Sequence, residues 1–258
     1  MNELPRILVA PNGARRGKSD HPQLPLIIPE IVQTAKACWH AGAGGLHLHV
    51  RDEQGEHTLD AGLYREAIAE LKKQLPSLFV QITTEAVGRY SPVEQRQVVK
   101  AVQPTAVSVS IAEMLADDDH NAVVDFYHWC DDEGIAVQHI LYSPTDLRLL
   151  TDLLSSLKNH TPKASQRQLL FVLGRYTKGQ QSHPDDLLMF TDWLLATGIQ
   201  ADWGACAFGQ SETECLLAAH QAGGKVRVGF ENSLWNADGA LALSNEARVA
   251  EIKRTLNI

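Results

Sequence analysis

The clearest alternation of apolar and polar positions along the chain lies in one short segment, GGLHLHVRD. Leu46, Leu48 and Val50 alternate with His47 and His49, and this period of two is typical of a β-strand. Both imidazoles therefore point to one face of the strand, and the apolar side chains point to the other. We interpret the segment as a buried strand that presents two histidines side by side.

Short apolar segments recur along the chain and alternate with amphipathic stretches of helical period. Besides the histidine segment, the pattern predicts strands at residues 6–10, 78–84, 106–110, 136–142, 169–173, 203–207 and 226–230. It predicts helices at 28–41, 64–75, from 91 onward, and at 121–133, 145–157, 184–196, 211–222 and 245–256. Ser91 and Ser211 each precede a glutamate by three positions, the pattern of a helix capping box.

This alternation, without a linker or a low-complexity segment, predicts one α/β domain, a (β/α)₈ TIM barrel over residues 1–258. A doubly wound open sheet is the alternative, although no GxGxxG or GxxxxGK[ST] phosphate loop is present. Barrel active sites lie at the C-terminal ends of the strands. That rule selects residues 12–18, 47–49, 83–85, 108–113, 142–143, 174–176 and 231–232.

Composition narrows the function. The 258 residues carry a formal net charge of -8, which argues against a nucleic-acid partner and against a polybasic membrane surface. The four cysteines form no CxxC pair and are typical of buried thiols in a reducing compartment. The N-terminal residues lack a signal-peptide layout, and no apolar run approaches the roughly 20 residues of a membrane span. We therefore expect a cytoplasmic protein.

The paired histidines suit a divalent metal, because each imidazole offers a neutral nitrogen. A catalytic zinc commonly takes three protein ligands and keeps one position open. Glu231, at the end of the eighth predicted strand, is our candidate for the third ligand, because strands eight, one and two adjoin in a closed barrel. A surface glutamate is the alternative. Two histidines and one carboxylate also suit iron(II), and we favour zinc.

Further polar residues lie near the predicted strand ends. Arg227 shares a strand face with Glu231 by parity, and it either pairs with a carboxylate or binds a substrate carboxylate. Arg15, in the loop after the first strand, is a candidate for capture of an anion. Glu85 is a candidate base. The hydroxyl groups at Thr83, Thr84, Ser108 and Ser110 either bind substrate or satisfy the backbone.

At these residues the chain resembles the β-keto acid cleavage enzymes. The resemblance rests on GxHxHxRD at residues 45–52 and on RVGxE at residues 227–231. It extends in order over nearly the whole chain, through these further segments: Gly13-Ala14, Pro22-Gln23-Leu24-Pro25, Gly55, Gln81-Ile82-Thr83-Thr84, Val172-Leu173-Gly174 and Ser244-Asn245.

The resemblance implies a (β/α)₈ barrel that assembles as a homo-oligomer, a tetramer or a dimer. It implies zinc on His47, His49 and Glu231. It also implies condensation of a β-keto acid with acetyl-CoA, which gives acetoacetate and a new CoA thioester. Arg227 and Thr83 would act near the reacting groups, and we add Glu85 to these catalytic residues.

The chain departs from the family pattern in three segments. Family members often carry Glu-Asp-Asn where this chain has Glu231-Asn232-Ser233, and asparagine cannot take a proton as a carboxylate does. Arg15 replaces a glutamate of the characterised member, and Gln138 stands where that member has a glutamate on the fifth strand. These changes favour a neutral or anionic β-keto acid over an amino-bearing one. We assign Arg15, Ser108 and Asn232 to substrate binding.

Because Asn232 cannot accept a proton as a general base, the base is either Glu85 or a group of the substrate. Two other functions stay open. A metal-dependent hydrolase of the amidohydrolase type also uses HxH in a barrel, although usually on the first strand. A non-catalytic barrel that binds a metal or a ligand is the third possibility.

Overall fold

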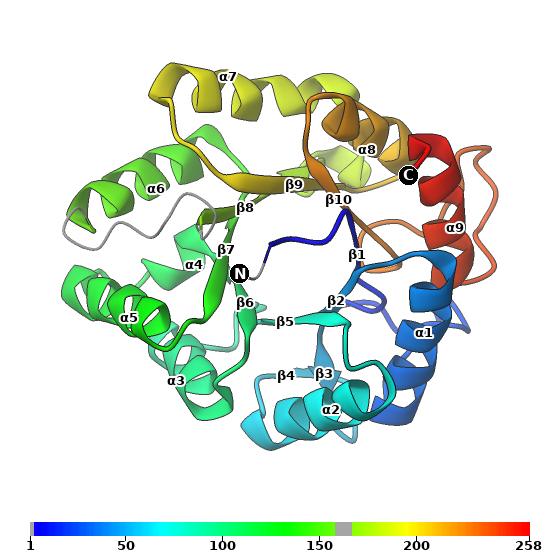
Figure 1. Cartoon of the computed structure of the whole chain (residues 1–258), viewed down its shortest axis with the longest axis horizontal. Coiled ribbons are helices and arrows are strands. Elements are labelled where there is room, and N and C mark those ends of the chain that lie inside the picture. The colour runs from blue at the N-terminus through cyan, green and yellow to red at the C-terminus, as the bar shows by residue number, and fades with distance from the viewer. Residues whose placement is uncertain (1–2, 158–166) are drawn as a thin grey trace.

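The computed structural model describes residues 3–157 and 167–258. Met1 and Asn2, the first residues of the N-terminal segment in which we found no signal-peptide layout, lie outside the described residues. In this part of the chain parallel strands close into a barrel, surrounded by helices (Figure 1). The prediction of a (β/α)₈ TIM barrel is therefore confirmed. The strands are β1 (Ile7–Val9), β2 (Gly45–Leu48), β5 (Phe79–Thr83), β6 (Ala106–Ser110), β7 (Ala136–Leu141), β8 (Arg167–Leu173), β9 (Asp202–Ala207) and β10 (Lys225–Val228).

The helices form the outer ring of the barrel in Figure 1. They are α1 (Ile28–Ala41), α2 (Ala61–Gln74), α3 (Pro92–Val102), α4 (Ile111–Met114), α5 (His120–Asp132), α6 (Pro144–Ser156), α7 (Leu188–Thr197), α8 (Glu212–Gln221) and α9 (Asn245–Leu256). Helix α1 turns an apolar stripe toward the strands, and its buried side chains are Ile31, Val32, Ala35 and Cys38. None of the helices described combines the length and the apolar character needed to cross a bilayer.

The order of strands brings the first, second and last of them together. β1 lies between β10 and β2, and its Val9 pairs with Val228 on one side and with Leu46 on the other. The C-terminal ends of these three strands therefore meet at one part of the barrel mouth. This adjacency is what allows a residue that follows β10 to reach a residue on β2.

Of the two capping boxes that the sequence predicts, one is present and one is not. Ser91 and Glu94 form the expected capping box at the start of α3. Ser211, by contrast, makes no side-chain capping bond at α8, since its backbone is not in the extended conformation that capping needs. The glutamate that follows it, Glu212, is instead buried against Arg248 of α9 at 2.7 Å.

The structure corrects three further expectations. The histidine segment is not one strand: β2 ends at Leu48, and β3 (Val50–Arg51) leaves the barrel to pair with β4 (His57–Thr58) as a hairpin. The helix predicted from residue 184 begins as a 3₁₀ turn, Pro184–Leu187, before α7. A short additional helix, α4, follows β6.

Candidate active site

Three possible metal-binding groups converge at the barrel mouth. The Nε2 atoms of His47 and His49 lie 3.1 Å apart. Glu231 Oε2 lies 3.5 Å from the first of these atoms and 3.3 Å from the second. The histidine side chains are fully buried and the glutamate is nearly so. The structure therefore brings together the two histidines and the glutamate that the sequence analysis grouped, which form a cluster with the geometry of a metal site.

Two glycines let Glu231 reach the histidines. Gly229 follows β10 and has a φ of +138°, a conformation that L-residues rarely adopt, and a Cβ there would lie 2.4 Å from the Ala10 carbonyl oxygen. Gly13, in the loop after β1, has a φ of +60°, and a Cβ there would lie 2.5 Å from Glu231 Cγ. Both positions bring the chain after β10 close to β1, so that Glu231 turns into the mouth.

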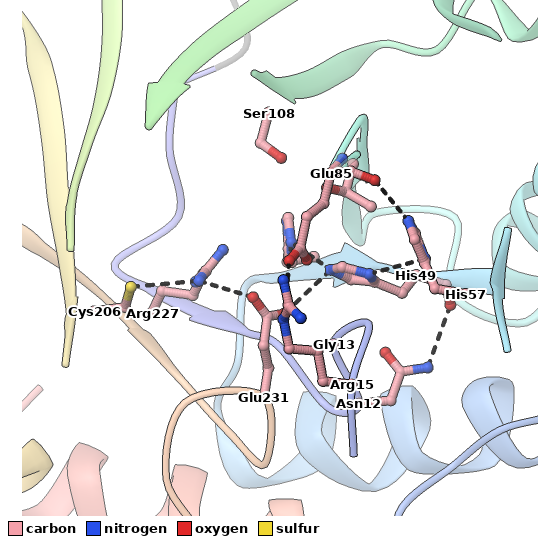
Figure 2. A network of polar contacts seen from close by, with 12 residues as sticks. Asn12, Gly13, Arg15, His49, His57, Glu85, Ser108, Cys206, Arg227 and Glu231 are labelled. Carbon is pink, nitrogen blue, oxygen red and sulfur yellow. Dashed lines mark hydrogen bonds and ion pairs between the residues drawn. The ribbon is translucent and has the colours of Figure 1, made fainter. Parts of the chain in front are cut away.

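The tautomer of His49 follows from its hydrogen bonds. His57, on β4, places Nε2 2.9 Å from the Glu85 carbonyl oxygen, which can only accept, so His57 Nε2 carries the hydrogen. Burial lowers the pKa of His57 to about 4, so its Nδ1 is an acceptor at neutral pH. That Nδ1 lies 3.4 Å from His49 Nδ1, which must therefore donate. The Nε2 lone pair of His49 is thus left facing Glu231 (Figure 2).

A second chain of hydrogen bonds fixes His47. Its Nδ1 lies 2.9 Å from Gln81 Oε1, which can only accept, so His47 Nδ1 donates. Gln81 Nε2 then donates to Gln138 Oε1 at 3.0 Å. Gln138 Nε2 in turn donates to the Leu169 carbonyl oxygen at 3.2 Å. This relay runs from β2 across the barrel interior to β8, and it leaves the His47 Nε2 lone pair facing the glutamate.

The electrostatics of the cluster are compatible with a bound cation. Burial, as the largest cause, lowers the pKa of His47 to about 4 and that of His49 to about 3, so both are neutral at pH 7. Burial would raise the pKa of Glu231, but Arg227 and then the two histidines hold that pKa well below its usual value. Two lone pairs and a carboxylate oxygen therefore face one another, and Glu231 Oε2 has no hydrogen-bond partner within the described residues. A divalent metal fits this donor set.

Arg227 pairs with the other oxygen of the glutamate. Its Nη2 lies 3.0 Å from Glu231 Oε1 and 3.3 Å from Cys206 Sγ (Figure 2). The sequence left open whether this arginine pairs with a carboxylate, and in this structure it does. Its Nε is buried without a hydrogen-bond partner among the described residues, and Arg227 lines the cavity beside the cluster. One donor thus remains for a ligand.

The cavity beside the cluster has a volume of about 130 Å³. The predicted residues Arg15, Thr83 and Glu85 line it together with Arg227. Burial, then the charges of Glu231 and Glu113, raise the pKa of Glu85 to about 7. Arg15 Nε lies 3.9 Å from Glu85 Oε1, and Figure 2 shows its guanidinium directed at that carboxylate. The hydroxyl of Thr83 accepts from the Glu85 backbone N–H at 3.0 Å.

The structure does not bring the other two predicted substrate-binding residues to this cavity. Ser108 is buried on β6, and its hydroxyl lies 3.5 Å from the Ile82 carbonyl oxygen. Asn232 is also fully buried, and neither side-chain polar atom has a partner within the described part of the chain. Neither residue is among those that line the cavity. Their roles in substrate binding stay predictions.

The sequence did not predict the residues that contact the Nδ1 atoms of His47 and His49. His57 gave no signal, because it lies in a short hairpin outside the barrel pattern. Gln81 and Gln138 did offer one, since each is a polar residue inside an otherwise apolar strand. The register pairs Gln81 with His47 across β2 and β5. That pairing marks Gln81 as a partner for the imidazole.

Comparison with known proteins agrees with this geometry. Residues 6–258 match the model of the β-keto acid cleavage enzyme family. The 3-keto-5-aminohexanoate cleavage enzyme of Acetoanaerobium sticklandii is 25% identical over 248 residues, which cover 94% of this chain and 88% of the relative. A 3-oxoadipate:acetyl-CoA acetyltransferase of Cupriavidus necator is 21% identical over 249 residues, which cover 95% and 86%.

Solved structures support the fold. The apo structure of ObcA superposes with a TM-score of 0.71 at 16% identity, over 90% of this chain. The match spans only 61% of the ObcA chain, and at this identity it shows the barrel alone. The family match, by contrast, runs through every strand of the barrel and includes the histidines and the glutamate. The chain therefore belongs to the β-keto acid cleavage enzyme family and is an enzyme.

Proposed function

We propose that the chain is a metal-dependent acyltransferase that converts a β-keto acid and acetyl-CoA into acetoacetate and a new acyl-CoA. The single observation that carries the proposal is the convergence of His47, His49 and Glu231 beside a small polar cavity. The relative from Cupriavidus necator, named a 3-oxoadipate:acetyl-CoA acetyltransferase, supports the choice of acetyl-CoA as the second substrate.

His47, His49 and Glu231 would hold the metal, which we propose is zinc. When bound, a zinc ion supplies Lewis acidity, which polarises a carbonyl and stabilises oxyanions. The small cavity admits a short acid, and its buried arginine can orient a carboxylate. We propose that Arg227 Nε meets the carboxylate of the β-keto acid.

Glu85 is our candidate for the base. Its raised pKa of about 7 is close to the working pH, which favours proton transfer in both directions. The Thr83 hydroxyl accepts from the Glu85 backbone N–H and so positions this residue at the end of β5. In the proposed reaction Glu85 takes a proton from the substrate.

The side chain of the keto acid is proposed to be neutral or anionic. Arg15 stands at the cavity where the characterised family member carries a glutamate, and it is more than half exposed. An arginine there favours a carboxylate or a neutral group over an ammonium group. A panel of neutral, anionic and amino-bearing β-keto acids tests this point.

Metal analysis of the purified protein, followed by a keto-acid screen with acetyl-CoA, tests the proposal. We expect about one zinc per chain and formation of acetoacetate. His49→Ala should lose both the metal and the turnover, whereas His40→Ala, on the exposed surface of α1, should keep both. Full metal occupancy in His49→Ala would refute the ligand assignment. Turnover without acetyl-CoA would favour a hydrolase, and tight keto-acid binding without any turnover would favour a binding protein.

We further propose a cytoplasmic homo-oligomer, either a tetramer or a dimer. The four cysteines are buried free thiols, which supports a reducing compartment. Helix α7 exposes Leu188, Met189 and Leu195, an apolar surface that another subunit can cover. Light scattering coupled to gel filtration measures the mass, and a monomer would contradict this proposal.

A further inference from the structure

A second cleft adjoins the catalytic cavity at the loop that follows β1. Its volume is about 510 Å³, within the roughly 300–1,000 Å³ that is typical of small-molecule sites. Ala14, Arg15 and Arg16 line both the cleft and the cavity, so the two spaces share one wall. The charged residues that line the cleft are Arg15, Arg16, Arg51, Arg89, Asp20 and Glu56.

Two of these arginines keep their charge although they donate to backbone carbonyl oxygens. Arg16 donates to the carbonyl oxygens of Phe230 and Asn232. Arg51 donates to the Gly55 carbonyl oxygen at 3.0 Å and to further carbonyl oxygens of the loop after β1. A carbonyl is neutral, so neither guanidinium is neutralised by its partner. The walls of the cleft are therefore positive in a chain whose net charge is -8.

The other two arginines expose part of their guanidinium groups to the cleft, and Arg89 Nη1 also donates to the His57 carbonyl oxygen at 3.3 Å. The side chain of Arg15 is 59% exposed, and its ion pair with Glu85 spans 3.9 Å. The side chain of Arg89 is 49% exposed, and its ion pair with Glu56 also spans 3.9 Å. Contacts this long in solvent are weak, so an incoming anion can displace them at little cost. Both arginines line the cleft and can turn toward a phosphate bound there.

A cleft on another side of the mouth differs in charge. It measures about 410 Å³, and Arg175 lines it together with Asp185 and Asp186. One arginine against two aspartates gives a lining that repels polyanions. A phosphate-bearing ligand that enters the mouth therefore favours the cleft with four arginines.

We propose that the cleft formed by Arg15, Arg16, Arg51 and Arg89 binds the phosphates of coenzyme A. This inference rests on the proposed use of acetyl-CoA. At about 130 Å³ the catalytic cavity is too small for the nucleotide, so the phosphates must lie outside it while the pantetheine arm reaches in. The pantetheine arm would pass along residues 14–16, which line both the cleft and the cavity. Guanidinium groups bind phosphate oxygens through paired hydrogen bonds.

The test uses Arg89→Gln in the full chain, because Arg89 lines this cleft and not the catalytic cavity. We expect the KM for acetyl-CoA to rise roughly tenfold, with kcat and the KM for the keto acid unchanged. Acetyl-pantetheine, which lacks every phosphate, should show the same KM with the variant and with the wild type. Arg65→Gln, an exposed arginine on α2 that lines a different surface pocket, is the matched control and should change nothing.

Calorimetry with CoA alone separates this inference from the proposed reaction. A Kd for CoA that is unchanged in Arg89→Gln, or an equal loss with acetyl-pantetheine, would overturn the inference. A Kd that rises in the variant would support the cleft even if no keto acid yields acetoacetate, and in that case only the proposed reaction fails. Equal melting temperatures of variant and wild type show that the fold is intact.

Discussion

The Nδ1 atoms of His49 and His57 lie 3.4 Å apart, and the far nitrogen of His57 donates to the Glu85 backbone carbonyl. A carbonyl thus determines the tautomer of His57, and His57 determines that of His49. The same logic applies to His47 through Gln81 and its neighbours. Partners of this kind orient metal ligands and raise their basicity, so their loss commonly lowers metal affinity by about 10- to 100-fold.

Replacing His57 should weaken the metal site without removing a ligand. In His57→Phe the Nδ1–H of His49 loses its acceptor, and the imidazole is free to rotate or change tautomer. We expect the metal dissociation constant, measured by competition with a chelator, to rise about 10- to 100-fold. His57→Gln keeps an acceptor and a donor on one side chain and should recover part of the loss. Equal affinity in wild type and His57→Phe would contradict the role of this contact.

Gln138 should contribute to stability through the other relay. It accepts from Gln81 and donates to the Leu169 carbonyl oxygen, and it is 1% exposed. Gln138→Met keeps the volume but leaves both partners buried and unpaired. We expect the free energy of unfolding in urea to fall by about 1–3 kcal/mol. Gln74→Met, at an exposed position of α2, should change it by less than about 0.5 kcal/mol, and a similar small change for Gln138→Met would contradict the relay.

Arg227 should act through the geometry of its guanidinium as well as through its charge. It holds Glu231 Oε1 at 3.0 Å and still has a buried Nε to offer. Lysine keeps the charge but cannot donate in two fixed directions. We expect Arg227→Lys to retain its metal and to lose about 10- to 100-fold in kcat/KM for the keto acid. Unchanged kcat/KM would show that charge alone suffices.

Parity and barrel order let the sequence predict that His47, His49 and Glu231 lie together. A period of two brings His47 and His49 to one face, and closure of the barrel puts the end of β10 beside β1 and β2. Glu231 nevertheless reaches the histidines from beyond the strand, which ends at Val228. The turn at Gly229 makes that possible, and no periodicity encodes it.

The hydrogen bonds that orient His47 and His49 depend on tertiary structure. His57 approaches His49 only because β3 and β4 pair as a hairpin outside the barrel, and no periodicity in the local sequence specifies its direction. Ser108, by contrast, was predicted from its position but does not line the cavity. Its place on β6 satisfies the strand-end rule, yet its hydroxyl lies near a backbone carbonyl and not in the cavity. Position along a barrel strand therefore predicts candidates, and the direction of each side chain decides among them.

Glu85 should produce a pH dependence of both activity and stability. Burial and two neighbouring carboxylates raise its pKa from 4.5 to about 7 in the folded protein. As a base it is active only when ionised, so kcat/KM should rise with pH through a limb near 7. The native state also holds this proton more tightly than the unfolded state does. The contribution of the protonated Glu85 carboxyl to the free energy of unfolding is therefore present below about pH 4.5 and is lost as the pH rises through about 7.

Glu85→Gln separates these effects from those of other titrating groups. Glutamine stays neutral at every pH, so the acidic limb of kcat/KM should vanish, and activity should fall by about 10²- to 10⁴-fold. The unfolding midpoint of the variant should also decline less than that of the wild type between pH 5 and pH 8. In Glu113→Gln, a second variant at the same cavity, loss of the Glu113 charge should lower the pKa of Glu85 and move the acidic limb to lower pH without abolishing it. If Glu85→Gln kept full activity and the acidic limb, the base would be a group of the substrate.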